Sequence, residues 1–242
     1  MIEIENCLST FHIDKNSLKI PTLDEYQTIW REWINYSDCK SLQGLDAFTF
    51  ADYTQGTSQA FDQFILRHSK DRQIIVLDGD FQYHACLGKY VEFKYVSERN
   101  QLEEVLKGPG LHALLISAPF SDFGCMHPDF EEIMRICDVM DIPVCLDLAY
   151  WGIAKHCHID LDFFPAIREV TCSLSKPFFT LENHRVGIRW TRDYADDGIS
   201  IIDYEYHSPE VISCQDTAPG YSTGCGCANC PVACSGKGVP EF

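Results

Sequence analysis

The chain has 242 residues, of which 45% are hydrophobic, enough for one substantial core or for one domain with a small appendage. Its formal net charge of −17 argues against nucleic acids and anionic membranes as partners, because like charges repel. No stretch approaches the roughly 20 apolar residues of a membrane span. The first residues alternate acidic and apolar side chains, unlike a secretory signal, so we expect a cytoplasmic protein.

Helical and strand patterns alternate along the chain. Apolar side chains at helical spacing predict helices over residues 22–36, 59–68, 98–106, 127–140 and 161–167. Short apolar runs predict strands over residues 73–77, 91–96, 112–117, 143–147, 170–174, 186–190 and 199–202. This alternation predicts an α/β fold with an open, mostly parallel sheet that is covered by helices on both faces.

Three segments differ in composition. Residues 1–45 form an N-terminal helical segment, residues 46–192 hold the alternating strands and helices, and residues 193–242 read as a short C-terminal remnant. The remnant ends in a tail that is rich in glycine and cysteine, with thiols at Cys225, Cys227, Cys230 and Cys234. Four thiols so close together could hold zinc or an iron–sulfur cluster, could be a substrate for processing, or could have no function.

A lysine follows the predicted strand 170–174. Lys176 ends the run Ser173-Leu174-Ser175-Lys176, and Arg185 follows nine residues later. These residue types suit the covalent capture of a phosphorylated aldehyde, since the amine would form an imine while the hydroxyls and the guanidinium would bind the phosphate.

Polar residues also stand at other predicted element ends. Gly56, Thr57 and Ser58 open the predicted helix 59–68, where amide hydrogens and the helix dipole favour an anion, although a plain helix cap has the same composition. Asp147 ends the predicted strand 143–147, and Tyr150 follows it. Asp147 could instead cap a turn, and Tyr150 could serve packing alone.

Taken in this order, these motifs resemble those of the fold-type I enzymes that depend on pyridoxal 5′-phosphate (PLP), and especially the class I/II aminotransferases. The resemblance covers roughly residues 50–191. It implies that Lys176 carries the cofactor as an imine and later moves a proton, that Asp147 keeps the ring nitrogen protonated in a site shielded from water, and that Tyr150 donates to the phenolate oxygen. On this basis residues 46–192 would be the PLP-binding large domain.

The same resemblance assigns the remaining side chains to cofactor binding. Phe81 would lie flat on the ring. Ser121 would stand in for the asparagine of the family's Asn-Pro-x-x-Gly turn, which residues 115–124 replace here. The phosphate would be held by Gly56, Thr57, Ser58, Ser173, Ser175 and Arg185.

The resemblance implies a homodimeric aminotransferase with a small-molecule amine or amino acid as substrate, although lyase chemistry uses the same cofactor contacts. Two departures stand out: the interval from Lys176 to Arg185 is one residue longer than usual, and the family's second domain is truncated or missing. The alternative is therefore a reduced relative that keeps the fold as a binding or scaffolding module.

Overall fold

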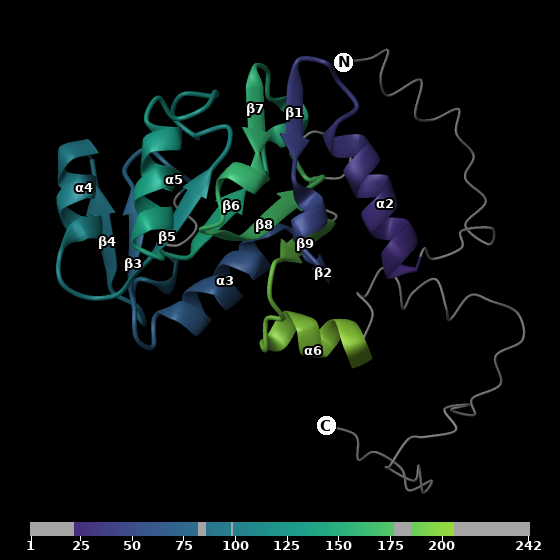
Figure 1. The fold of residues 1–242 in the computed structure, drawn as a ribbon. Coiled ribbons are helices and arrows are strands. Elements are labelled where there is room, and N and C mark those ends of the chain that lie inside the picture. Colours follow the sequence, from purple (N-terminus) through teal and green to yellow (C-terminus); the bar gives the residue numbers. More distant parts are fainter. Residues whose placement is uncertain (1–21, 82–85, 98, 177–184, 206–242) are drawn as a thin grey trace, which may run out of the picture. The chain divides into compact units, whose positions relative to one another are not determined.

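The computed structural model describes residues 22–81, 86–97, 99–176 and 185–205, and a seven-stranded sheet lies at its centre (Figure 1). The sheet order is β2 (Phe50–Thr54), β9 (Gly187–Thr191), β8 (Ile167–Ser173), β6 (Val144–Asp147), β5 (His112–Ser117), β3 (Gln73–Leu77) and β4 (Phe93–Val96). The five strands from β8 to β4 are parallel, whereas β9 runs antiparallel to both of its neighbours. The predicted mostly parallel sheet is confirmed.

Helices cover both faces of this sheet. On one face lie α2 (Leu23–Ile34), α4 (Arg99–Lys107) and α5 (Phe130–Val139), and their apolar side chains share a core with Ile75 and Ile116. On the other face α3 (Thr57–His68) packs on Ile74 and Val76, the alternate residues of β3. A strand exposes successive side chains to opposite faces, so a continuous apolar run serves both cores.

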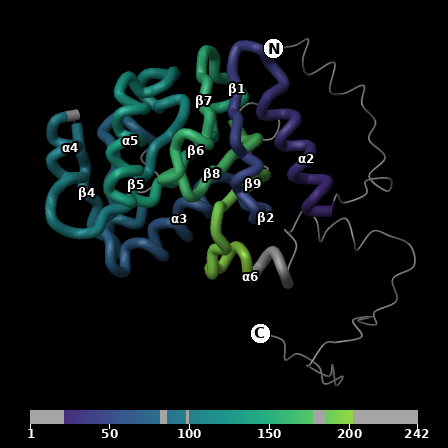
Figure 2. Tube along the Cα trace, viewed as in Figure 1, coloured from purple at the N-terminus to yellow at the C-terminus, as the bar shows by residue number. Residues whose placement is uncertain are grey.

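Segments that are far apart in sequence meet at the sheet. Figure 2 shows β2, from the blue part of the chain, beside the green β9, and Ala51 pairs with Trp190 there. The helix α2 starts with a capping box between Thr22 and Glu25. It also donates a hydrogen bond from the Tyr26 hydroxyl to the backbone oxygen of Gly187, at 3.0 Å. The N-terminal helix is thereby fixed to the last strand.

A buried ion network holds α6 (Gly198–Glu205) to the sheet. The Arg189 side chain is fully buried, and its guanidinium donates to Asp52 Oδ2 at 2.9 Å, to Asp197 Oδ2 at 2.6 Å and to Ser200 Oγ at 3.0 Å. Both α2 and α6 contact β2, and all described residues belong to one compact unit. The predicted boundaries at residues 45/46 and 192/193 stay predictions.

Several element predictions are wrong. Residues 199–202 lie in α6 instead of a strand, and residues 161–167 form a single 3₁₀ turn, Leu161–Phe163, before β8 begins. Three strands were not predicted: β2 and the separate parallel pair β1 (Lys40–Gln43) and β7 (Cys157–Asp160). Each of them is short and interrupted by polar residues, so none has the apolar run that identifies the central strands.

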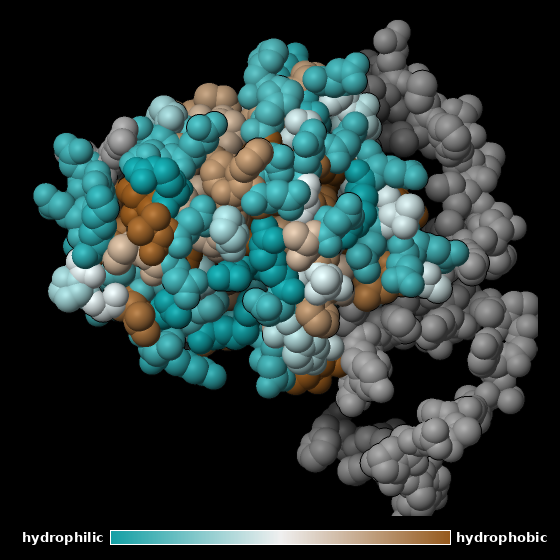
Figure 3. All heavy atoms as spheres, viewed as in Figure 1, coloured by the Kyte–Doolittle hydropathy of each residue, from teal (hydrophilic) through white to brown (hydrophobic). Residues whose placement is uncertain are grey.

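The surface agrees with the acidic composition. On the face seen in Figure 3 most of the described surface is hydrophilic, and hydrophobic residues gather in small separate groups. None of the helices in the described ranges is long and apolar enough to cross a bilayer. The cysteine tail, with Cys225, Cys227, Cys230 and Cys234, lies outside the described residues.

Candidate functional site

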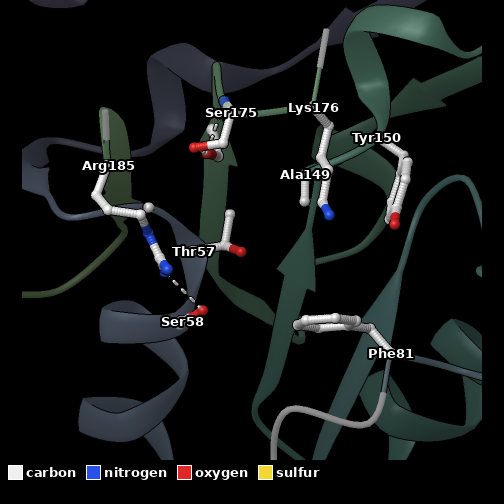
Figure 4. Close-up of a pocket in the computed structure, with 10 residues that line it drawn as sticks. Thr57, Ser58, Phe81, Ala149, Tyr150, Ser175, Lys176 and Arg185 are labelled. Atoms are coloured by element: carbon white, nitrogen blue, oxygen red, sulfur yellow. Dashed lines mark hydrogen bonds between the residues drawn. The ribbon is translucent and has the colours of Figure 1, made fainter. Parts of the chain in front are cut away.

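A pocket opens at the carboxyl ends of the parallel strands, where open α/β sheets bind their ligands. It has a volume of about 170 Å³. Nine of the eleven side chains predicted from the sequence line it, and Figure 4 shows most of them pointing into one hollow from different elements. The nine are Gly56, Thr57, Ser58, Phe81, Tyr150, Ser173, Ser175, Lys176 and Arg185; Ala149 is the further lining residue.

One end of the pocket is built for an anion. The Arg185 guanidinium donates to Ser58 Oγ at 3.0 Å, at the first turn of α3, where amide hydrogens lack helical partners (Figure 4). Gly56 precedes this turn with φ +74° and ψ 175°, a conformation available almost to glycine alone. A Cβ at Gly56 would lie 3.2 Å from Arg185 Nε. The glycine therefore lets the arginine and the helix start approach each other.

Two serines continue this lining at the end of β8. The backbone amide of Ser175 donates to Ser173 Oγ at 3.2 Å, and the Ser173 hydroxyl lies 3.3 Å from the backbone oxygen of Val186 and 3.1 Å from Ser175 Oγ. These bonds fix the chain direction immediately before Lys176 and place both hydroxyls in the pocket wall.

The amine of Lys176 lies opposite two aromatic rings. Its Nζ is 5.4 Å from the centroid of the Tyr150 ring, and the Phe81 ring lies across the pocket from it (Figure 4). Phe81 is in turn supported from below by Phe61, with ring centroids 6.5 Å apart. Lys176 is exposed, whereas the expected partner of the ring nitrogen, Asp147, is buried.

Asp147 lies next to the pocket without lining it. The residue is 2% exposed at the end of β6, and its Oδ1 accepts a hydrogen bond from the amide of Ala149 at 2.9 Å. Its Oδ2 is buried without a hydrogen-bond partner. Burial, and next to it the charge of Asp80, raises the pKa of Asp147 to about 8, although hydrogen bonds from the Ala149 amide and the Thr57 side chain, and then the charge of Lys176, oppose the shift. A buried carboxylate oxygen without a partner is costly, and a protonated ring nitrogen would supply the missing donor.

Ser121 does not line the pocket either. Its hydroxyl donates to Asp80 Oδ1 at 3.1 Å, away from the residues that form the wall. Asp80 itself was not predicted from the sequence, although it offers a signal similar to that of Asp147, a carboxylate close to the end of a buried strand, three residues past Leu77. Among the described residues no group of three or more histidine, cysteine or acidic side chains could hold a metal ion.

No protein-family model and no curated protein matches the chain in sequence. Solved structures match in fold. A PLP-bound C-S lyase from Staphylococcus hominis superposes with a TM-score of 0.60 at 10% identity, over 87% of this chain and 56% of the lyase. An aromatic-amino-acid aminotransferase from Burkholderia pseudomallei, covalently bound to pyridoxal phosphate, gives 0.55 at 16% identity, over 83% and 56%. Tyrosine aminotransferase from Leishmania infantum gives 0.51 at 17% identity, over 69% and 49%.

The chain thus spans about half the length of the solved structures that it matches. At these identities the likeness concerns the fold alone. The chain has the fold of PLP-dependent aminotransferases and C-S lyases.

Proposed function

We propose that the pocket binds PLP and that the chain is a PLP-dependent enzyme acting on an amino acid or a related amine. One observation carries this proposal: a lysine amine and an anion-binding helix start line one cavity, and the buried carboxyl of Asp147, whose Oδ2 has no hydrogen-bond partner, lies next to it. Neighbours in fold that hold the same cofactor support it. PLP would supply an electron sink for a carbanion at the substrate carbon.

The described residues fit the cofactor at each end. Arg185, Ser58 and the amides of the first turn of α3 would hold the phosphate, with Thr57 and the serines of β8 beside them. Phe81 would lie against the ring, and Asp147 would face the ring nitrogen. Because the pKa of Asp147 is raised to about 8, the free carboxyl holds a proton at neutral pH and can share it with that nitrogen.

Two side chains are placed to move protons. The Lys176 amine points into the pocket, where it can take a proton from the substrate carbon and return it to another atom. Tyr150 lies beside this amine and can donate its hydroxyl hydrogen to an oxygen on the ring. The Ser121 hydroxyl faces Asp80, so we assign no contact with the cofactor to it.

Cofactor loading tests the proposal. Purified protein incubated with PLP should gain the visible absorption of PLP that is covalently held by a lysine, and borohydride reduction should add the cofactor mass to the peptide that contains Lys176. The variant Lys176→Ala should lose both signals, while Lys155→Ala, at an exposed lysine outside the pocket, should keep them. A wild-type protein that cannot be loaded, or a Lys176→Ala protein that still can, would overturn it.

We assign the reaction to amino-group transfer, because the Ser-x-Ser-Lys and Arg-x-Gly motifs follow the aminotransferase pattern. The test offers amino acids with and without an α-keto acid. Product formation that needs the keto acid supports transfer. Release of ammonia and a thiol from cysteine-type substrates without keto acid would assign the chain to C-S lyases instead, whose fold it shares.

A second candidate is a binding or scaffolding module. It is favoured by the exposed Lys176. A protein that binds PLP but turns over no amine would support this reading. The homodimer and the cytoplasmic location also stay proposals, and sedimentation of the loaded protein checks the first.

A further inference from the structure

We propose that Asp80 is a positioning residue of this pocket, which fixes Phe81 opposite Lys176 and acts on Asp147 through its negative charge. The inference rests on the proposed function, but its test uses protein without cofactor. Asp80 lies in the turn after β3, is 9% exposed, and directly precedes the residue assigned to the ring.

The first step of the argument is geometric. Asp80 Oδ1 accepts from the amide of Phe81 at 2.7 Å, and Oδ2 accepts from the amide of Ser117 at 2.8 Å. The hydroxyls of Ser117 and Ser121 donate to Oδ1 as well. One carboxylate thus joins the turn that carries Phe81 to the end of β5. Two amides and two hydroxyls at a single side chain are a set of donors that favours its ionised form.

The second step concerns charge. Burial raises the pKa of Asp80, and the hydrogen bonds from the amides of Phe81 and Ser117 and from Ser121 oppose that rise. The pKa of Asp147 is raised by burial and then by Asp80. The remaining titratable groups that face Asp147 are Lys176, which acts in the opposite direction, and the thiols of Cys145 and Cys172, whose own pKa values are raised by burial. Asp80 is therefore the negative charge that adds to burial in favouring the protonated form of Asp147.

The experiment measures carboxyl titration directly. Carbon-13 spectra of aspartate-labelled, cofactor-free protein follow each buried carboxyl with pH, and the Asp147 signal is identified by its loss in Asp147→Asn. In Asp80→Asn the Asp147 midpoint should shift downward, because the neighbouring negative charge is gone. The matched control is Asp78→Asn, in the same turn, whose carboxylate bonds to Ser97 instead. It should leave the Asp147 midpoint in place.

Amide hydrogen exchange tests the positioning role of Asp80 separately from its charge role. An asparagine at position 80 keeps one carbonyl oxygen and so can serve one of the two amides, whereas Asp80→Ala serves neither. We expect faster exchange at one amide of the pair Phe81 and Ser117 in the first variant and at both in the second. Unchanged exchange in Asp80→Ala would contradict the positioning role.

A reciprocal variant keeps the inference testable if substitutions at Asp80 fail to fold. Asp147→Asn leaves every bond to Asp80 intact. In the wild type the Asp80 carbon signal should show a second step where Asp147 loses its proton, near pH 8, and Asp147→Asn should remove that step. An Asp80 signal without this step, together with an unmoved Asp147 midpoint in Asp80→Asn, would overturn the charge role. Because no cofactor is present, this failure is distinguishable from a failure to bind PLP.

Discussion

The substitution Gly56→Ala should disturb the anion-binding end of the pocket, although it removes no side-chain contact. The glycine has φ +74° and ψ 175°, and residues with a side chain pay about 1–3 kcal/mol to hold such a conformation. The added Cβ would also meet Arg185 Nε at 3.2 Å and Nη2 at 3.3 Å, tighter than ordinary contact. Because the guanidinium end of Arg185 is flexible, the backbone conformation of residue 56 accounts for most of the free-energy cost.

The two ways of relieving this strain give different signals. If the turn keeps its shape, the free energy of unfolding should fall by about 1–3 kcal/mol, visible as a lower urea midpoint at unchanged slope. If the turn relaxes, stability recovers, but the start of α3 moves away from Arg185 and the affinity for PLP should fall. Urea unfolding and spectroscopic PLP titration of the same preparation measure both quantities.

Gly124→Ala is the matched control. Gly124 also has a positive φ, +65°, but a Cβ there meets no atom within 4 Å, and the residue lies outside the pocket. It should show a stability loss of about 1–2 kcal/mol, the cost of one left-handed residue, and no loss of PLP affinity. A Gly56→Ala protein that is as stable as the wild type and binds PLP equally well would refute the reasoning.

Three further predictions follow from the pocket and from the buried charges. The folded-state pKa of Asp147 is about 8, above its ordinary value of 3.8, so the folded cofactor-free protein holds a proton that the unfolded chain releases. The free energy of unfolding should therefore fall as the pH rises from about 4 to 8. Asp147→Asn should flatten this part of the pH profile. Equal slopes in both proteins would contradict it. Arg189→Met should lower the free energy of unfolding by about 3–5 kcal/mol, since it removes the ion-pair partner of the buried Asp52 and one of the two ion-pair partners of Asp197, whereas Arg135→Met, at an exposed helix pair, should leave the urea midpoint unchanged. Arg185→Met should weaken PLP binding about tenfold to a hundredfold, the value of one or two charged hydrogen bonds, while the urea unfolding midpoint stays in place. If Arg168→Met, outside this pocket, weakened PLP binding as much, the loss would come from the change in the protein's overall charge instead.

The central strands could be predicted because their burial leaves a direct signal in the sequence. Every residue of β5 and β6 is buried, so each reads as an uninterrupted apolar run between polar turns. The start of α3 at Thr57 could also be predicted, because Gly56, Thr57 and Ser58 mark the opening of the helix. The run around residue 199 was ambiguous, because a short apolar stretch fits a strand or a helix equally well.

The missed features depend on neighbours that are remote in sequence. Asp197 accepts from the amides of Ile199 and Ser200, a helix-start signal that could have been read, but its burial depends on Arg189. Asp80 contacts Ser117 because β3 and β5 are neighbouring strands in the sheet. The order of the strands cannot be predicted from the sequence of either segment alone. Nine pocket residues could be identified since each lies within a few residues of the end or the start of an element, which fixes its end of the sheet.

The placement of β9 has a consequence for how the chain acquires its structure during synthesis. Strand Gly187–Thr191 sits between β8 and β2, so the partner of residues 50–54 is translated more than 130 residues after them. Until it emerges from the ribosome, both flanking strands present bare hydrogen-bonding edges, which are templates for wrong pairing. Nascent chains stalled before residue 187 should therefore associate with one another or with chaperones. Once residues 187–191 have also left the ribosome and paired with both strands, this association should stop.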